Sequence, residues 1–212
     1  MIYVRQLDKV RQEKPLLFSY RRCPYAMRAR MALLSCGIDF DIFEISLKDK
    51  PKQMIEISPK GTVPVFVYKD LVLDESIDIM NWATEQKNNT SIKINPNDLE
   101  TIKSLIKSND GEFKNKLDLY KYTSNKEASL KIRYRKECEV YIRNIDKILE
   151  TQEYLLSNKI GYLDIAIFPF IRQFFNVDLK WFEQAYYNNL KNWVNRITNS
   201  DLFIQIMKKP EF

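Results

Sequence analysis

The 212-residue chain contains no histidine. Without histidine it cannot form a Ser-His-Asp or Cys-His triad, a histidine-ligated zinc site or a histidine general base. Any chemistry must therefore come from Cys, Ser, Tyr, Lys, Asp or Glu side chains, or from a bound cofactor.

Cysteines and long apolar runs are also scarce. Cys23, Cys36 and Cys138 are odd in number and widely spaced, which argues against a disulfide framework and for a reducing compartment. No segment reaches the length of a membrane span, and residues 1–15 turn from a short apolar start into a charged run that does not suit a secretory signal. We therefore expect a cytoplasmic protein with no membrane partner.

A strong charge of one sign is missing as well. The chain has 34 Lys and Arg against 28 Asp and Glu, a formal net charge of +6. A nucleic-acid binder could have this balance. The basic residues are mixed with acidic ones along the chain, however, and there is no Gly/aromatic RNA-binding signature. We interpret the charge as a solvated, lysine-rich surface and predict no nucleic-acid partner.

The residues that are present suffice for a globular core, since 45% are hydrophobic and 29% charged. Short apolar, β-branched and aromatic runs in the first third have the character of strands, and the stretches between them include helical spacing. The expected order is strand 16–19, helix 24–37, strand 40–45, strands 63–68 and 71–73, and a helix opening at 74–76.

The rest of the chain has a helical pattern. Residues 87–98 are polar, contain Pro96 and form the best linker candidate. Tyr141, Ile145 and Leu149 mark one amphipathic stripe. Residues 164–175 are apolar almost all round, which predicts a buried helix with a kink or a first turn at Pro169.

One motif carries the clearest chemistry. Cys23-Pro24-Tyr25-Ala26 stands where the first strand meets the first helix. The first amides of a helix have no partners of their own, and the helix dipole favours an anion there, so both lower the pKa of a thiol at that position. Arg21, Arg22 and Arg28 could assist. The alternative is a buried, inert cysteine, the usual state of a free Cys.

This motif resembles the active-site loop of glutaredoxins and of bacterial cysteine-type (omega- or beta-like) glutathione S-transferases. The resemblance implies that Cys23 is the catalytic nucleophile. Ala26 stands where the dithiol enzymes have their second cysteine. The implied chemistry therefore runs through a mixed disulfide of Cys23 with glutathione, which a second glutathione resolves.

Two further stretches resemble the same family in the expected order. Gly61-Thr62-Val63-Pro64 is similar to its turn with a cis-proline, in which the residue before proline, here Val63, pairs with the glutathione backbone. Glu75-Ser76 is similar to its pair at a helix start, which implies contacts with the ammonium and carboxylate of the γ-glutamyl group. Taken alone, these stretches would also suit a plain strand start and a plain helix cap.

The remaining site residues come from the same resemblance. Lys50, just before Pro51, corresponds to a lysine that binds the glycyl carboxylate, and Leu47 corresponds to a backbone contact. Lys50 could equally be a solvated loop charge. Tyr25 follows the catalytic loop, and either it or Ser19 could donate a hydrogen bond to the Cys23 sulfur. The predicted glutathione-binding residues are Tyr25, Leu47, Lys50, Val63, Pro64, Glu75 and Ser76.

The family resemblance also gives the expected fold class. We expect an α/β thioredoxin-like N-terminal domain (β-α-β-α-β-β-α) at 1–86, a linker at 87–98 and an all-α C-terminal domain at 99–212. The family implies a cleft for the second substrate, for which Phe113, Leu117 and Tyr120 are candidates; packing of these three into the helical bundle is the alternative. Asp164 is expected to cap its helix by reaching back to Gly161, a structural role.

The expected function is glutathione-dependent thiol transfer or reduction, with glutathione as cosubstrate, no metal and a small electrophilic or disulfide second substrate. The family also implies a homodimer. Two alternatives stay open: a conventional glutathione-conjugating transferase, and a non-catalytic adaptor of the same fold associated with RNA polymerase or translation.

Overall fold

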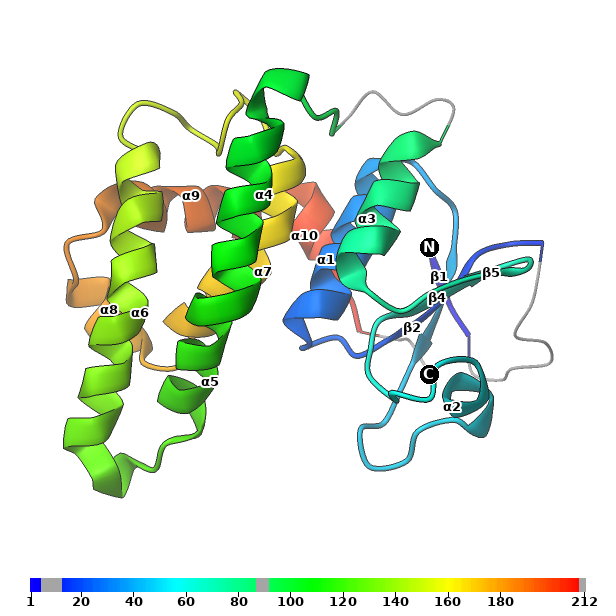
Figure 1. The fold of residues 1–212 in the computed structure, drawn as a ribbon, viewed down its shortest axis with the longest axis horizontal. Helices are drawn as coiled ribbons and strands as arrows, with labels where there is room; N and C mark the ends of the chain where they lie inside the picture. Colours follow the sequence, from blue (N-terminus) through cyan, green and yellow to red (C-terminus); the bar gives the residue numbers. More distant parts are fainter. Residues whose placement is uncertain (5–12, 87–91, 210–212) are drawn as a thin grey trace. The chain divides into compact units, whose positions relative to one another are not determined.

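The computed structural model describes residues 1–4, 13–86 and 92–209. Its contacts divide the chain into two compact units, one formed by Met1–Lys93 with Ser200–Phe212 and the other by Ile94–Asn199 (Figure 1).

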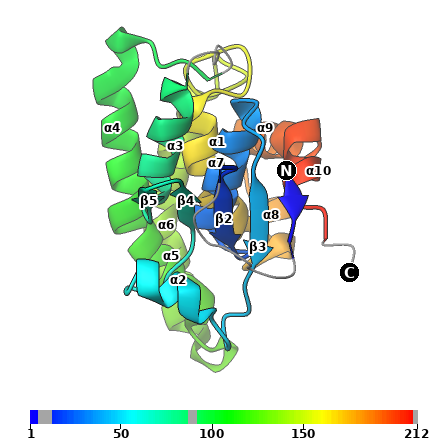
Figure 2. The same cartoon turned by 90° about the vertical axis from the view of Figure 1, so that its right-hand side faces the viewer.

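The first unit is built on a five-stranded mixed sheet in the order β1-β3-β2-β4-β5 (Figure 2). The strands are β1 (Ile2–Tyr3), β2 (Leu16–Ser19), β3 (Asp41–Glu44), β4 (Val65–Tyr68) and β5 (Leu71–Leu73). β3 runs parallel to both β1 and β2, whereas β4 is antiparallel to β2 and to β5.

Helices cover both faces of this sheet. α1 (Pro24–Ser35) and α3 (Ser76–Glu85) lie on one face, and α2 (Lys52–Ile57) lies on the other (Figure 2). Because side chains alternate along a strand, Leu17 packs beneath α1 and α3, whereas Leu16 and Phe18 pack beneath α2. The central strand is therefore buried on both sides.

The predicted thioredoxin-like fold of this part is confirmed. The short helix α2 occupies the lysine-rich connection before β4, and it completes the β-α-β-α-β-β-α order. β1 adds a strand of only two residues at the edge of the sheet, which the sequence pattern did not predict.

The C-terminal segment differs from the expected domain boundary. The prediction placed everything from 99 to 212 in the helical domain, but α10 (Asp201–Ile206) packs beside α1 in the first unit (Figure 1). Phe203 and Ile206 are the buried residues of α10. Of the predicted linker, residues 87–91 lie outside the described residues, and Pro96–Asp98 form a 3₁₀ turn.

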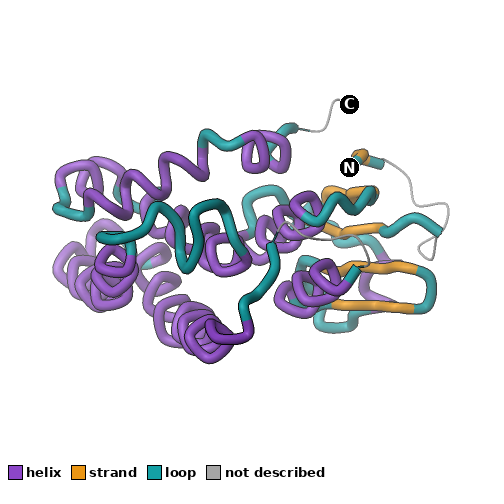
Figure 3. Tube along the Cα trace, turned by 90° about the horizontal axis from the view of Figure 1, so that it is seen from above, coloured by secondary structure: helices purple, strands orange, loops and turns teal. Residues whose placement is uncertain are grey.

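The second unit is a bundle of helices, as predicted (Figure 3). It contains α4 (Leu99–Ser108), a π-helical turn (Asn109–Phe113), α5 (Lys114–Tyr122), a 3₁₀ turn (Asn125–Glu127), α6 (Ala128–Ile148), α7 (Tyr162–Phe175), α8 (Leu179–Gln184) and α9 (Asn188–Thr198). α7 is buried over nearly its whole length and contains Pro169. Asp164 accepts a hydrogen bond from the Gly161 amide, as expected.

The described ranges contain neither a membrane-spanning helix nor a cluster of metal ligands. None of the helices there is both long enough and apolar enough to cross a membrane. No group of three or more Cys, Asp or Glu side chains in the same ranges is arranged to hold a metal ion.

Candidate functional site

Cys23 occupies the junction that the sequence predicted. It is the N-cap residue of α1, and its carbonyl accepts the first helical hydrogen bond from the Met27 amide at 2.9 Å. Pro24 suits the first helical position because it has no amide hydrogen to leave unpaired. The half-buried thiol therefore stands at the start of a twelve-residue helix.

The turn before β4 lies against this thiol. Cys23 Sγ donates a hydrogen bond to the Val63 carbonyl oxygen at 3.6 Å, and the Val63-Pro64 peptide bond is cis. The structure thus brings together two predicted site residues that are forty positions apart. Sequence reasoning had considered Ser19 and Tyr25 as donors to the sulfur and missed this contact with a carbonyl.

Gly61 shapes the same turn. Its φ of +60° lies in the left-handed region, and a Cβ at this position would come within 3.1 Å of Ile55 Cδ1. The same Cβ would lie 3.8 Å from Lys50 Nζ. Lys50 is therefore beside the turn that presents Val63, which is compatible with its predicted role.

The start of α3 is tied to α1 by a buried arginine. Ser76 is 3% exposed, and its Oγ accepts a hydrogen bond from Arg28 Nη1 at 3.1 Å. Arg28 is fully buried, and its guanidinium lies 5.7 Å from the centre of the half-buried Tyr25 ring. A hydroxyl that accepts one hydrogen bond still carries a hydrogen to donate. Arg28 thus orients Ser76, a role that the sequence did not suggest.

An ion-pair cluster lies beside Ser76. Lys60 Nζ donates to Glu75 Oε1 at 2.6 Å and to Asp74 Oδ1 at 3.1 Å, and the Ser58 hydroxyl donates to Asp74 Oδ2 at 2.7 Å. The bond to Glu75 raises the pKa of Lys60, and the bond from Ser58 lowers the pKa of Asp74. Glu75 is thus at the predicted helix start, with Lys60 as a partner that sequence reasoning missed.

Ser19 and Leu47 are the two remaining residues that the sequence predicted at the site. Ser19 is fully buried, and its hydroxyl has no hydrogen-bond partner within the described part of the chain. The side chain of Leu47 is 53% exposed. For Leu47 the family implies a contact through the backbone, so this exposure does not bear on its predicted role.

Phe113, Leu117 and Tyr120 require a correction. All three are at most 2% exposed. The Phe113 ring stacks on Tyr141 at 4.7 Å between centroids, and the Tyr120 ring lies 5.6 Å from Phe174. Burial raises the pKa of Tyr120 to about 12. These residues belong to the core of the helical unit, which was the alternative, because their apolar faces point inward at helical spacing.

A second buried arginine supports the Cys23 loop. Arg30 donates to the carbonyls of Arg21 and Ile206, each at 2.7 Å, and burial lowers the pKa of its guanidinium. Arg21 donates its amide to Glu44 Oε1. The loop before Cys23 is therefore held to β3 and to α10. In the sequence, Arg28 and Arg30 interrupt an otherwise apolar run of Met27, Ala29 and Met31, and this interruption was the available sign of two buried arginines.

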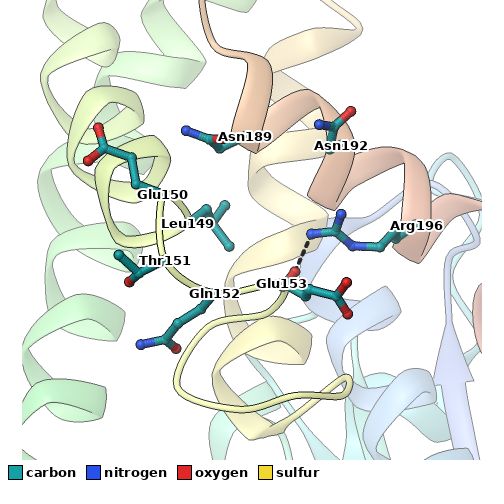
Figure 4. A pocket seen from close by; sticks show the side chains of 8 residues that line it. All are labelled: Leu149, Glu150, Thr151, Gln152, Glu153, Asn189, Asn192 and Arg196. Carbon is teal, nitrogen blue, oxygen red and sulfur yellow. Dashed lines mark hydrogen bonds between the residues drawn. The ribbon is translucent and has the colours of Figure 1, made fainter.

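The helical unit has a hollow of its own, of about 280 Å³ (Figure 4). Residues 149–153, which follow α6, line one side, and Asn189, Asn192 and Arg196 of α9 line the other. Arg196 donates to the Glu153 carbonyl. None of the predicted site residues lines this hollow.

Comparison with known families assigns both parts of the chain. Residues 17–91 match the glutathione S-transferase N-terminal domain, and residues 102–201 match the glutathione S-transferase C-terminal domain. Together the two matches cover most of the chain.

Individual relatives are distant. The chain is 23% identical over 190 residues to a stringent starvation protein A homolog of Haemophilus influenzae, covering 89% of this chain and 88% of that protein. It is 27% identical over 180 residues to a probable maleylacetoacetate isomerase of Caenorhabditis elegans, covering 79% of this chain and 83% of that protein. A glutathione S-transferase omega-1 of Rattus norvegicus is 45% identical over 49 residues, which cover 23% of this chain and 20% of that protein.

Solved structures share the fold. A Tau class glutathione S-transferase from mango superposes with a TM-score of 0.80 at 22% identity, covering 93% of this chain and 94% of that one. A glutathione transferase family member from Pseudomonas fluorescens with two glutathione bound has a TM-score of 0.80 at 16% identity, covering 92% of each chain. With both domain matches and this fold, the chain belongs to the glutathione S-transferase superfamily.

Proposed function

We propose that the chain binds glutathione at the Cys23 site and that Cys23 is the nucleophile of a glutathione-dependent thiol transfer. The observation that carries the proposal is the placement of the thiol. Cys23 Sγ stands at the start of α1 and 3.6 Å from the carbonyl of Val63, the residue proposed to pair with the glutathione backbone. A thiolate is stabilised there by the helix-start amides.

The proposed reaction is an exchange of one disulfide for another. The Cys23 thiolate attacks the glutathionyl sulfur of a mixed disulfide, which breaks the substrate S–S bond, forms a Cys23–glutathione disulfide and releases the substrate thiolate to take a proton. A second glutathione thiolate then attacks the glutathionyl sulfur, forming glutathione disulfide and restoring Cys23. Ala26 leaves no second thiol within the motif for an internal resolving step.

The other predicted residues are proposed to hold the tripeptide. Val63 would pair with the backbone, and Ser76, oriented by Arg28, would donate to the γ-glutamyl carboxylate. Glu75 would accept from the ammonium, and Lys50, beside the turn, would bind the glycyl carboxylate. Glutathione bound in the Pseudomonas fluorescens relative supports this ligand for the fold.

The test is glutathione-dependent reduction of a small mixed disulfide by the purified protein. We expect activity in the wild type and in Cys36→Ser, the matched control, and background rates in Cys23→Ser. Equal activity in Cys23→Ser would contradict the proposal. Conjugation of an electrophilic aromatic compound by Cys23→Ser at the wild-type rate would favour the conventional transferase.

A second candidate is a non-catalytic adaptor. The Haemophilus influenzae relative, similar over 89% of this chain, is named for stringent starvation and not for a transferase activity. Retention on a glutathione column separates the two candidates, because an adaptor without a glutathione site would pass through the column unretarded.

We also propose that the protein is a cytoplasmic homodimer, as the cysteine usage and the family suggest. Light scattering on the purified protein tests the dimer, and fractionation of cells tests the location.

A further inference from the structure

The acidic residues at the start of α3 are already paired with a cation of the chain itself. Lys60 Nζ lies 2.6 Å from Glu75 Oε1 and 3.1 Å from Asp74 Oδ1. Lys60 directly precedes the turn that presents Val63, so this ion pair joins the two segments proposed to hold glutathione. The Lys60 ammonium thus already binds the Glu75 carboxylate, to which the ammonium of a ligand would bind.

Asp74 and Glu75 differ in how many hydrogen bonds hold their carboxylates in place. Asp74 is bound from both sides, because Oδ1 accepts from Lys60 and Oδ2 accepts from the buried Ser58. The Glu75 side chain is 64% exposed and makes no capping hydrogen bond to α3. Glu75 can therefore change partner at little cost, while Asp74 retains Lys60.

We propose that Lys60 competes with the α-ammonium of γ-glutamyl ligands for Glu75 and so sets the affinity of the site for glutathione. This inference rests on the proposed function. Lysine and the ligand ammonium are both compact cations with three donors, so they satisfy one carboxylate in the same way. Exposed ion pairs are weak. The competition should therefore change affinity by only a few-fold.

The opposite role for Lys60 would be to attract a carboxylate of the ligand. The two roles differ in sign, since removing a competitor strengthens the binding of an ammonium, whereas removing an attractive charge weakens the binding of any anion. The sign of the change in affinity for an ammonium-bearing ligand therefore separates them, and an analogue without the ammonium group shows how much of the change depends on that group.

The experiment is calorimetric titration of the full chain with S-methylglutathione and with its analogue in which hydrogen replaces the α-amino group. The proteins are wild type, Lys60→Met, Glu75→Gln and Lys52→Met, the last removing the same charge from an exposed position of α2. The quantity compared is the ratio of the two dissociation constants within each protein. Because the two ligands differ by one unit of net charge, removing any nearby positive charge shifts this ratio, and Lys52→Met measures that general shift.

We expect the preference for the ammonium-bearing ligand to be about threefold or more higher in Lys60→Met than in Lys52→Met, as the loss of an exposed ion pair allows. S-methylglutathione should also bind Lys60→Met more tightly than it binds the wild type. In Glu75→Gln the preference should fall toward one. A preference in Lys60→Met no higher than in Lys52→Met, or weaker binding of S-methylglutathione by Lys60→Met, with wild-type binding intact, would overturn this inference alone. Binding of neither ligand by any of the proteins would overturn the proposed function and this inference together.

Discussion

The proposed chemistry depends on the surroundings of a single sulfur atom. Cys23 Sγ faces the Val63 carbonyl, and the start of α1 lies beside it. Cys138 differs in every respect, since it is fully buried in α6 and burial raises the pKa of its thiol to about 12. Reactivity should therefore distinguish these two cysteines sharply.

Alkylation of the native protein with iodoacetamide at pH 7 should modify Cys23 and leave Cys138 untouched. The thiolate is the reactive form, and a thiol with a pKa of about 12 is almost wholly protonated at that pH. Peptide mass spectrometry after short exposure measures the extent of modification at each site. Modification of Cys138 as fast as Cys23 would contradict the structure.

Ser76 offers a second test at the residue scale. Replacing Ser76 with Ala removes both the acceptor of Arg28 and the proposed donor to the γ-glutamyl carboxylate. We expect the dissociation constant for glutathione to rise about tenfold, the equivalent of one hydrogen bond to a charged group. Alkylation of Cys23 serves as the control and should proceed at the wild-type rate. Unchanged glutathione affinity would remove Ser76 from the site.

At the scale of elements, the start of α7 depends on one buried carboxylate. Asp164 Oδ2 accepts from the Gly161 amide at 2.8 Å, while Oδ1 accepts from the Leu155 amide at 2.9 Å and from Trp193 Nε1 at 2.6 Å. Since Gly161 has no side chain to cap the helix, Asp164 alone closes this turn. Burial raises the pKa of Asp164 to about 6.

This pKa predicts a pH dependence whose sign is opposite to that of an ordinary ion pair. The folded-state value lies above the unfolded value of about 3.9, so the folded protein binds more protons between pH 4 and 6 and loses stability as the pH rises through that window. Two pKa units correspond to about 3 kcal/mol. Asp164→Asn lacks this contribution.

Urea unfolding of both proteins at pH 4.5 and 7 measures the effect. Asp164→Asn should be less stable at either pH, because its side-chain amide leaves the Gly161 N–H without an acceptor, a loss of about 1–3 kcal/mol. The difference in unfolding free energy between wild type and variant should be larger at pH 4.5 than at pH 7. A difference that grows with pH would contradict the raised pKa.

At the scale of the whole molecule, the first unit is not continuous in sequence, because Ile94–Asn199 of the second unit separates its two segments. α10 returns to the first unit, where the Ile206 carbonyl accepts from Arg30 and the Lys208 carbonyl accepts from Tyr3 at 3.1 Å. Phe203 and Ile206 are buried there, and each contributes about 1.5–3 kcal/mol by burial. The end of the chain thus stabilises its beginning.

Deleting residues 200–212 should therefore loosen the first unit and spare the second. We expect hydrogen exchange to accelerate in α1 and β1, which lose the contacts through Arg30 and Tyr3, while α6 and α7 keep their protection. A matched control is Ile204→Ser, because Ile204 is 51% exposed and its loss should change nothing. Faster exchange confined to α6 and α7 would contradict the division into units.

The sequence predicted the main elements because each has a clear local pattern, such as the apolar run 16–19 and the all-apolar stretch 164–175. β1 was missed because an element of two residues carries too little periodicity to detect. The six residues of α2 gave no clear pattern either, and the second helix of the expected order came from the family resemblance alone. The return of α10 depends on contacts with partners about 176 to 205 positions away, which no local pattern encodes.

The candidate site, too, could be predicted from the sequence only in part. Cys23 and Val63 could be predicted because the motif and the turn occur in the order of a known family, and the structure brings them into contact. Lys60 was missed because it is one of several lysines in its stretch, and its partners are 14 and 15 positions away, directly before α3. The orientation of Phe113 could not be fixed, since one helical stripe can face a cleft or a core.

The central claim is that Cys23 carries glutathione as a mixed disulfide. Its most direct test is the intact mass of the protein after incubation with glutathione disulfide, followed by peptide mapping. We predict one attached glutathione, located at Cys23 and removed by reduced glutathione. No adduct, or an adduct at Cys36 with Cys23 unmodified, would contradict the account.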